Sequence, residues 1–140
     1  MDVEQLAHGL WSWTTPEGAC VYYEAPDAVV LFDPLVPSDE EEEFLTHLDR
    51  DVERLGLPVS ILLTADLHER SAPFLRGRYQ AEHRVPATVE AYPIGQRAEE
   101  VAYFIRPHRA LVIAAPNRSS AAIAALPVEL VLVTNPAGAS

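Results

Sequence analysis

The sequence predicts an α/β fold in which mixed β-sheets are flanked by helices. Short runs of β-branched and aromatic residues, separated by turn residues, fill positions 3–33 and indicate strands. Residues 39–55 then repeat apolar side chains at three- and four-residue intervals, which is the spacing of one helical face. The apolar run 59–64 indicates another strand, and a second helix follows it. This order of strands, helix, strand and helix favours a layered sandwich.

Three strands are expected in the early part of the chain, at residues 3–14, 19–24 and 28–33. Turn residues 15–18 and 26–27 separate them. The third run is apolar throughout, as expected for a strand that is buried on both faces. Pro34 and Pro37 follow it and end the strand.

The helix expected at 39–55 has clear start and stop signals. Ser38 and Glu41 fit a capping box, and the acidic residues 39–42 lie where the helix dipole favours negative charge. Gly56 and Pro58 end the helix. Its apolar stripe consists of Phe44, Leu45, Leu48, Val52 and Leu55.

The second half of the chain holds shorter elements. A helix is expected to begin at Ser71 and to turn Phe74, Leu75 and Tyr79 toward the core. Strands are expected around 84–92, 100–106 and 110–114, followed by a small helix that ends near 125 and a last strand at 128–133.

Length and composition indicate one globular domain, residues 1–140. Of the 140 residues, 49% are hydrophobic and 22% are charged, which is the balance of a packed protein. No apolar run approaches the roughly 20 residues that cross a bilayer, and the acidic start of the chain lacks the features of a secretory signal. A soluble, cytoplasmic protein is therefore expected.

The charge balance argues against several classes of function. The formal net charge is −11, and all ten basic residues are arginines. Phosphate backbones and anionic membranes repel such a surface, so we expect neither a nucleic-acid partner nor a membrane partner. The absence of lysine removes Schiff-base chemistry and the P-loop lysine. The single cysteine, Cys20, lies in an expected strand without a local positive charge, so we expect a buried, inert thiol.

Residues 62–71, with the sequence Leu-Leu-Thr-Ala-Asp-Leu-His-Glu-Arg-Ser, are expected to form a buried strand that runs into a polar loop and then a helix. This stretch resembles the metallo-β-lactamase-fold hydrolases, whose signature is a strand ending in Leu-Leu-Thr and a loop of pattern His-x-His-x-Asp-His. The resemblance extends to the strand with Leu10 and Trp11, the strand that ends in Asp33, the helix at 39–55, and segments 93–95, 108–112 and 131–134. It implies a compact, truncated metallo-β-lactamase-like αββα sandwich.

The same resemblance places the metal ligands of these hydrolases on residues of other kinds. The two histidines, the aspartate and the last histidine of the loop fall on Ala65, Leu67, Glu69 and Arg70. The next histidine falls on Gln96, and the final one on Asn135. The bridging aspartate falls on Ala114 or Ala115. Only Glu69 retains any ligand character.

Ligand chemistry decides what these replacements mean. A catalytic zinc needs about three protein ligands and an open position for water. Alanine and leucine cannot coordinate a metal, and an arginine is a fixed cation that opposes one. Without the metal, no group at this site lowers the pKa of a water molecule to near neutrality. Segments 84–92 and 115–127 are also short where relatives carry loops around the active site. The resemblance therefore implies a metal-free, non-hydrolytic relative, without a cofactor.

Three functions from different classes remain open. The first is a binding or interaction module, in which a homodimer or another protein partner buries surface that the missing loops expose. The second is a metallo-hydrolase with a rebuilt zinc site at Asp66, His68 and Glu69. The third is a metal-free enzyme that uses the ancestral cleft for small-molecule chemistry, with His68 as a general base oriented by Glu69 or Asp33.

Asp33 and the tryptophans have structural interpretations. A buried carboxylate needs partners, so we expect Asp33 to bind backbone amides of residues 64–68 or to pair with Arg70. Trp11 and Trp13 alternate on one strand and share a face, which favours packing in the core or at an interface.

Overall fold

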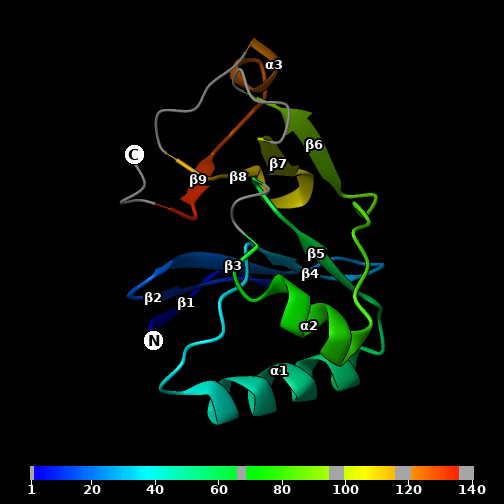
Figure 1. Cartoon of the computed structure of the whole chain (residues 1–140). Helices are drawn as coiled ribbons and strands as arrows, with labels where there is room; N and C mark the ends of the chain where they lie inside the picture. Colours follow the sequence, from blue (N-terminus) through cyan, green and yellow to red (C-terminus); the bar gives the residue numbers. More distant parts are fainter. Residues whose placement is uncertain (1, 66–68, 95–99, 116–120, 136–140) are drawn as a thin grey trace.

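The computed structural model describes residues 2–65, 69–94, 100–115 and 121–135, which form four layers (Figure 1). The first sheet has the order β1-β2-β3-β4-β5, and the second has the order β6-β7-β8-β9. Helices α1 (Glu41–Leu55) and α2 (Ala72–Tyr79) cover the outer face of the first sheet, and α3 (Ala121–Ala124) lies over the second. The strands are β1 (Asp2–Ala7), β2 (Leu10–Thr15), β3 (Gly18–Glu24), β4 (Val29–Phe32), β5 (Val59–Leu62), β6 (Val89–Pro93), β7 (Val101–Ile105), β8 (Ala110–Ile113) and β9 (Leu130–Val133).

Both sheets are mixed, as the sequence predicts. Strands β1 to β4 pair antiparallel, and so do β6 to β8. The pairs β4–β5 and β8–β9 are parallel, and each needs a crossover between its strands. The first crossover contains α1 and the second contains α3. The predicted αββα sandwich is therefore confirmed.

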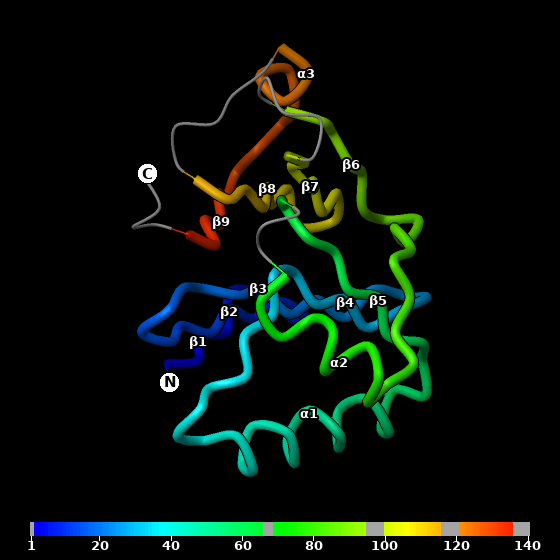
Figure 2. The backbone as a smooth tube through the Cα atoms, in the orientation of Figure 1, coloured from blue at the N-terminus to red at the C-terminus, as the bar shows by residue number. Residues whose placement is uncertain are grey.

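Three apolar clusters hold the layers together. The inner faces of the two sheets meet around Leu10, Phe32, Tyr103 and Val112. A second cluster joins the first sheet to α1 and α2, and a third joins the outer face of the second sheet to α3. Figure 2 shows residues 80–88 running beside both sheets, from α2 to β6. None of the described helices combines the length and the hydropathy that a membrane span requires.

The start of α1 differs from the prediction. Glu40 is the N-cap and makes no side-chain cap hydrogen bond, so the capping box of Ser38 and Glu41 is wrong. The amide of Glu40 instead donates to the carbonyl of Pro37, which closes a turn before the helix begins. The end of the helix is confirmed, because Gly56 adopts a left-handed conformation and its amide donates to Val52.

Two further expectations need correction. The stretch predicted as one strand at 3–14 is a hairpin of β1 and β2, with Gly9 at a φ of 79° in the turn. Phe74 is 48% exposed, although Leu75 is fully buried. The helical period explains Phe74, since Ala72 and Leu75 lie on the buried face of α2 and a residue two positions after Ala72 points away from it.

Candidate functional site

The candidate site lies where three strand ends from the two sheets meet. Asp33 follows β4, Thr64 lies just beyond β5, and Thr134 follows β9. All three side chains are buried, with exposures of 0%, 1% and 0%. In an open α/β architecture, the carboxyl ends of strands are the usual location for functional residues. The site in this chain is therefore at the expected edge but is closed to solvent at these three positions.

Asp33 accepts hydrogen bonds from both partner segments. The backbone amide of Thr64 donates to Oδ1 over 2.9 Å, and the Thr64 hydroxyl donates to Oδ2. The Thr134 hydroxyl donates to the same Oδ2 over 2.7 Å. Asp33 also has a positive φ of 48°. The expected bond from Asp33 to a backbone amide of the 64–68 segment is thus present at Thr64, and Asp33 joins the ends of three strands.

Arg70 crosses between the two sheets. Its Nη1 donates to the carbonyls of Ala19 and Asp33, each over 2.8 Å. Its Nη2 donates to the carbonyl of Thr134, also over 2.8 Å. Ala19 and Asp33 lie in or next to strands of the first sheet, and Thr134 follows a strand of the second sheet. One guanidinium group therefore links three strand ends by charge-assisted hydrogen bonds.

Gly18 leaves the space that Arg70 occupies. A Cβ atom at this position would lie 2.6 Å from Nη2 of Arg70 and 3.1 Å from the carbonyl oxygen of Thr134. Gly18 has a φ of 154°, which further disfavours a side chain. The amide of the next residue, Ala19, donates to Thr134 over 2.9 Å. The start of β3 is thus fitted against Arg70 and the end of β9.

Cys20 lies beside this guanidinium but is not a nucleophile. Its Sγ is 3.8 Å from Nη1 of Arg70, and the residue is fully buried. Burial raises the pKa of the Cys20 thiol to about 12, although the charge of Arg70 lowers it. The thiol is therefore protonated at neutral pH, which agrees with the inert role expected from the sequence.

The other candidate residues occupy different environments. Asp66, Leu67, His68 and Gln96 lie outside the described residues. Glu69 is exposed, and its backbone carbonyl accepts from the amide of Ala72. Ala65 and Asn135 are half-buried, and the amide of Asn135 donates to Ala114. Ala114 is half-buried and Ala115 is buried. The rebuilt zinc site and a general base at His68 therefore remain predictions.

The described residues of the site do not fit a divalent metal. The donors that converge here are backbone carbonyls, and the cation that they bind is already the guanidinium of Arg70. Zinc prefers imidazole, thiolate and carboxylate ligands. Asp33 supplies a carboxylate, but both of its oxygens accept hydrogen bonds from threonines. Within the described part of the chain, no group of three histidine, cysteine, aspartate or glutamate side chains is placed to hold a metal ion.

The sequence predicts Arg70 as a replaced metal ligand or as a partner of Asp33, but it does not predict the contacts of Arg70 with Ala19 and Thr134. Those contacts are to backbone carbonyls 51 and 64 residues away. Every residue has a backbone carbonyl, so the residue types in the sequence do not identify these partners. The signals that were present are Gly18 at the start of a strand and Thr134 at the end of one. Neither signal identifies an arginine as the partner without the fold.

Comparison with known proteins supports the fold. A metallo-beta-lactamase from Erythrobacter litoralis, solved in a mono-zinc form, is 14% identical in sequence and has a TM-score of 0.54. The match covers 87% of this chain and 73% of that one. The crystal structure of VMB-1 at pH 5.5 is 10% identical, with a TM-score of 0.52 and coverage of 79% and 68%. No protein-family model matches the chain, and a search of curated proteins found no match. At these identities the likeness concerns the fold alone, and the metallo-β-lactamase fold predicted from the sequence is confirmed.

Proposed function

We propose that this chain is a metal-independent, non-hydrolytic protein of the metallo-β-lactamase fold that acts as a binding or interaction module. The observation that carries the proposal is the position of Arg70. Its guanidinium binds the carbonyls of Ala19, Asp33 and Thr134 at the place where the resemblance expects a metal-binding histidine.

The physical argument rests on charge. A guanidinium is protonated at every pH at which proteins are folded, so its positive charge is permanent. A divalent cation a few Å away would be repelled, and at an effective dielectric constant of about 20 two unit charges 4 Å apart already interact by about 4 kcal/mol. Arg70 also supplies a bridge between the sheets without a metal. Metal-activated water is therefore not part of the proposed function.

The metal content of the purified protein tests this proposal. After incubation with zinc, manganese and iron and then desalting, elemental analysis is expected to find well below about 0.1 metal ion per chain. A zinc-dependent metallo-β-lactamase treated in parallel serves as the positive control. With zinc present, hydrolysis of a chromogenic β-lactam by this chain is expected to equal the rate in buffer.

The rebuilt zinc site gives a different result in the same assay. About one tightly held metal ion per chain, lost when Asp66, His68 and Glu69 are all replaced by alanine, would overturn the metal-free proposal. Retained metal that this triple replacement does not release would also overturn it and would place the ligands elsewhere.

The partners of such a module remain proposals as well. The net charge of −11 argues against nucleic acid and anionic membranes. A second copy of the chain, another protein or a small molecule is compatible with this charge. The exposed apolar side chain of Val131, 51% exposed on β9 at the edge of the second sheet, is one surface that a protein partner would cover.

A further inference from the structure

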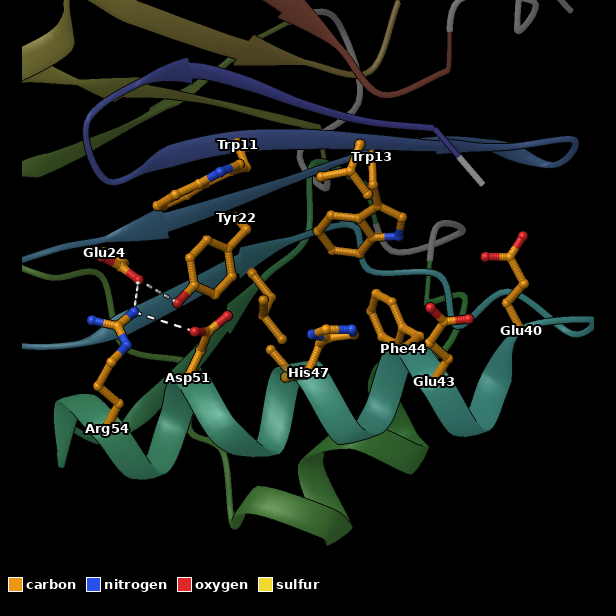
Figure 3. A pocket seen from close by; sticks show the side chains of 13 residues that line it. Trp11, Trp13, Tyr22, Glu24, Glu40, Glu43, Phe44, His47, Asp51 and Arg54 are labelled. Atoms are coloured by element: carbon orange, nitrogen blue, oxygen red, sulfur yellow. Dashed lines mark hydrogen bonds and ion pairs between the residues drawn. The ribbon is translucent and has the colours of Figure 1, made fainter.

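A groove of about 520 Å³ lies between α1 and strands β1 to β4 (Figure 3). It shares no residue with the network of Asp33 and Arg70. Its volume is within the range of about 300–1,000 Å³ that small-molecule sites occupy. The groove is therefore large enough to be a binding site separate from the edge where the strand ends meet.

Aromatic side chains form the floor of the groove. Trp11 on β2 lies directly opposite Tyr22 on β3, and their ring centroids are 5.4 Å apart in an edge-to-face arrangement. Trp13 contacts Phe44 of α1, also with 5.4 Å between ring centroids. Trp13 and Tyr22 are buried, and Trp11 is half-buried. The floor thus consists of two aromatic pairs together with the apolar side chains of Leu31 and Leu48, between a sheet and a helix.

The polar ends of these rings are already bonded. The indole N–H of Trp13 donates to the carbonyl of Leu35 over 2.9 Å. The Tyr22 hydroxyl donates to Glu24 over 2.7 Å. These two rings are buried, so the half-buried ring of Trp11 is the part of the aromatic floor that a ligand can reach. The negative faces of aromatic rings attract cations.

Carboxylates surround this floor. Figure 3 shows Glu24 and Asp51 at one end of the groove and Glu40 and Glu43 at the other. Arg54 is the single guanidinium among the lining residues, and it binds both Glu24 and Asp51. Glu43 is exposed, and its side chain has no hydrogen bond or ion pair within the described residues. The lining thus has four carboxylates against two basic side chains, Arg54 and His47, which leaves an excess of negative charge.

We propose that this groove binds a small organic cation with an apolar or aromatic body, such as a substituted amine or a quaternary ammonium compound. The ring faces of the floor attract a cation, and the carboxylates at both ends complement its charge. The same carboxylates repel anions, and a neutral apolar ligand would partly desolvate them without compensation. Charge complementarity thus selects the cation.

This inference rests on the proposed function in one respect, because both take the chain to be a protein that binds a ligand or partner. The two proposals fail separately, because metal content and cation binding are measured independently. A metal-containing protein that binds the cation would overturn only the first proposal, and a metal-free protein that does not bind it would overturn only the second.

The experiment is a fluorescence titration with benzyltrimethylammonium. The chain contains two tryptophans, and both line the groove, so intrinsic fluorescence reports on this site. Saturable quenching is expected with a Kd of about 1 mM or lower, which is within reach for so small a ligand. Benzyl alcohol and benzenesulfonate have similar aromatic bodies without the positive charge, and both are expected to bind at least about tenfold more weakly.

Three variants test the lining. Glu43→Gln is expected to weaken cation binding about threefold, because it removes one carboxylate near the floor. Glu53→Gln is the matched control, since Glu53 is an exposed residue of α1 outside the groove, and it should leave the Kd unchanged. Trp11→Leu keeps an apolar side chain but removes the aromatic face, and a loss of about three- to tenfold is expected, with Trp13 as the remaining reporter.

The result that supports the proposal is saturable binding of the cation that Glu43→Gln and Trp11→Leu weaken and Glu53→Gln does not. Equal binding of benzyl alcohol, or equal effects of Glu43→Gln and Glu53→Gln, would overturn it. Quenching by an arginine-rich peptide without any by benzyltrimethylammonium would also overturn it and would assign the groove to a basic polypeptide.

Discussion

Arg70 is the residue that joins most parts of the site. A metal ion holds its ligands through coordination of side chains, whereas this guanidinium holds three backbone carbonyls. Hydrogen bonds to a charged group contribute about 1.5–3 kcal/mol each, more than neutral ones. The side chain is also half-buried, which limits competition from water. Arg70 is therefore expected to contribute to stability far beyond an ordinary surface arginine.

Replacing Arg70 by methionine tests this contribution. The variant keeps an unbranched apolar stem but leaves the carbonyls of Ala19 and Asp33 without this donor. We expect the free energy of unfolding to fall by about 2–4 kcal/mol. Chemical denaturation followed by circular dichroism measures the change.

Two other variants give this measurement its controls. Arg50 is an exposed residue of α1 without a hydrogen bond or ion pair within the described residues, so Arg50→Met should change stability by less than about 0.5 kcal/mol. Arg70→Lys should recover only part of the loss, because an ammonium group cannot reproduce the planar fork of donors. Equal effects of Arg70→Met and Arg50→Met would contradict the bridging role.

At the scale of elements, the β2–β3 hairpin brings Gly18 against Arg70. Helix α2 contains a contrasting glycine, Gly77, where an added Cβ would meet nothing within 4 Å. Gly18 is therefore required by a close contact with Arg70, whereas Gly77 has room for a side chain and only adds flexibility to the helix. Their alanine variants are expected to change stability in opposite directions.

Gly18→Ala is expected to destabilise the protein by about 1–3 kcal/mol, because its Cβ must displace Nη2 of Arg70. Gly77→Ala is expected to stabilise it by about 0.5–1 kcal/mol through the helix propensity of alanine. Thermal and chemical denaturation of both variants measure these changes. In an Arg70→Met background the cost of Gly18→Ala should shrink, since the displaced group is gone. Full additivity of the two changes would argue against their contact.

The spacing of apolar residues predicts most of the helices and strands. It is a weaker guide where a single residue determines a turn or a helix cap. The helix at 39–55 and the buried strands follow from spacing and turn residues, because many positions contribute to each pattern. The sequence does not predict the turn at Gly9, since a lone glycine gives a weak turn signal. The helix begins two residues later than the capping box predicts, because a turn from Pro37 to Glu40 precedes it and makes Glu40 the N-cap. The cost of burying a carboxylate predicts that Asp33 binds an amide of residues 64–68, and the bond from Thr64 confirms it. The aromatic groove is not predictable in this way, because only the fold places Trp11 opposite α1.

At the scale of the whole molecule, the buried thiol of Cys20 and the buried tyrosine hydroxyls make the protein less stable at alkaline pH. Burial raises the pKa of Cys20 to about 12, and burial also raises the pKa values of Tyr22 and Tyr103 above their usual range. In the unfolded chain these groups lose their protons near their ordinary values of 9.0 and 10.0. Above those values the unfolded state binds fewer protons than the folded state, so stability falls as pH rises.

The free energy of unfolding is therefore expected to decline from about pH 9 upward, by about 1.4 kcal/mol per pH unit for each fully ionised group. Urea denaturation at several pH values between 8 and 11 measures the slope. Cys20→Ala should move the onset up by about one pH unit, because the tyrosines then determine it. Stability that stays level up to pH 11 would show that these groups are not buried as described.

The bond from Thr134 to Asp33 has a consequence for protein synthesis, because it joins residues 101 positions apart. The first sheet and its two helices are complete in the nascent chain by residue 79, but the segment that completes the second sheet emerges only with β9. At about 5–20 residues per second, synthesis of the residues between α2 and the end of β9 takes several seconds. During this time the inner face of the first sheet has no complete second sheet to pack against. Until then Leu10, Val30 and Phe32 lack the side chains of the second sheet that cover them in the complete fold. The complete sandwich can therefore form only after β9 has been synthesised and has left the ribosome.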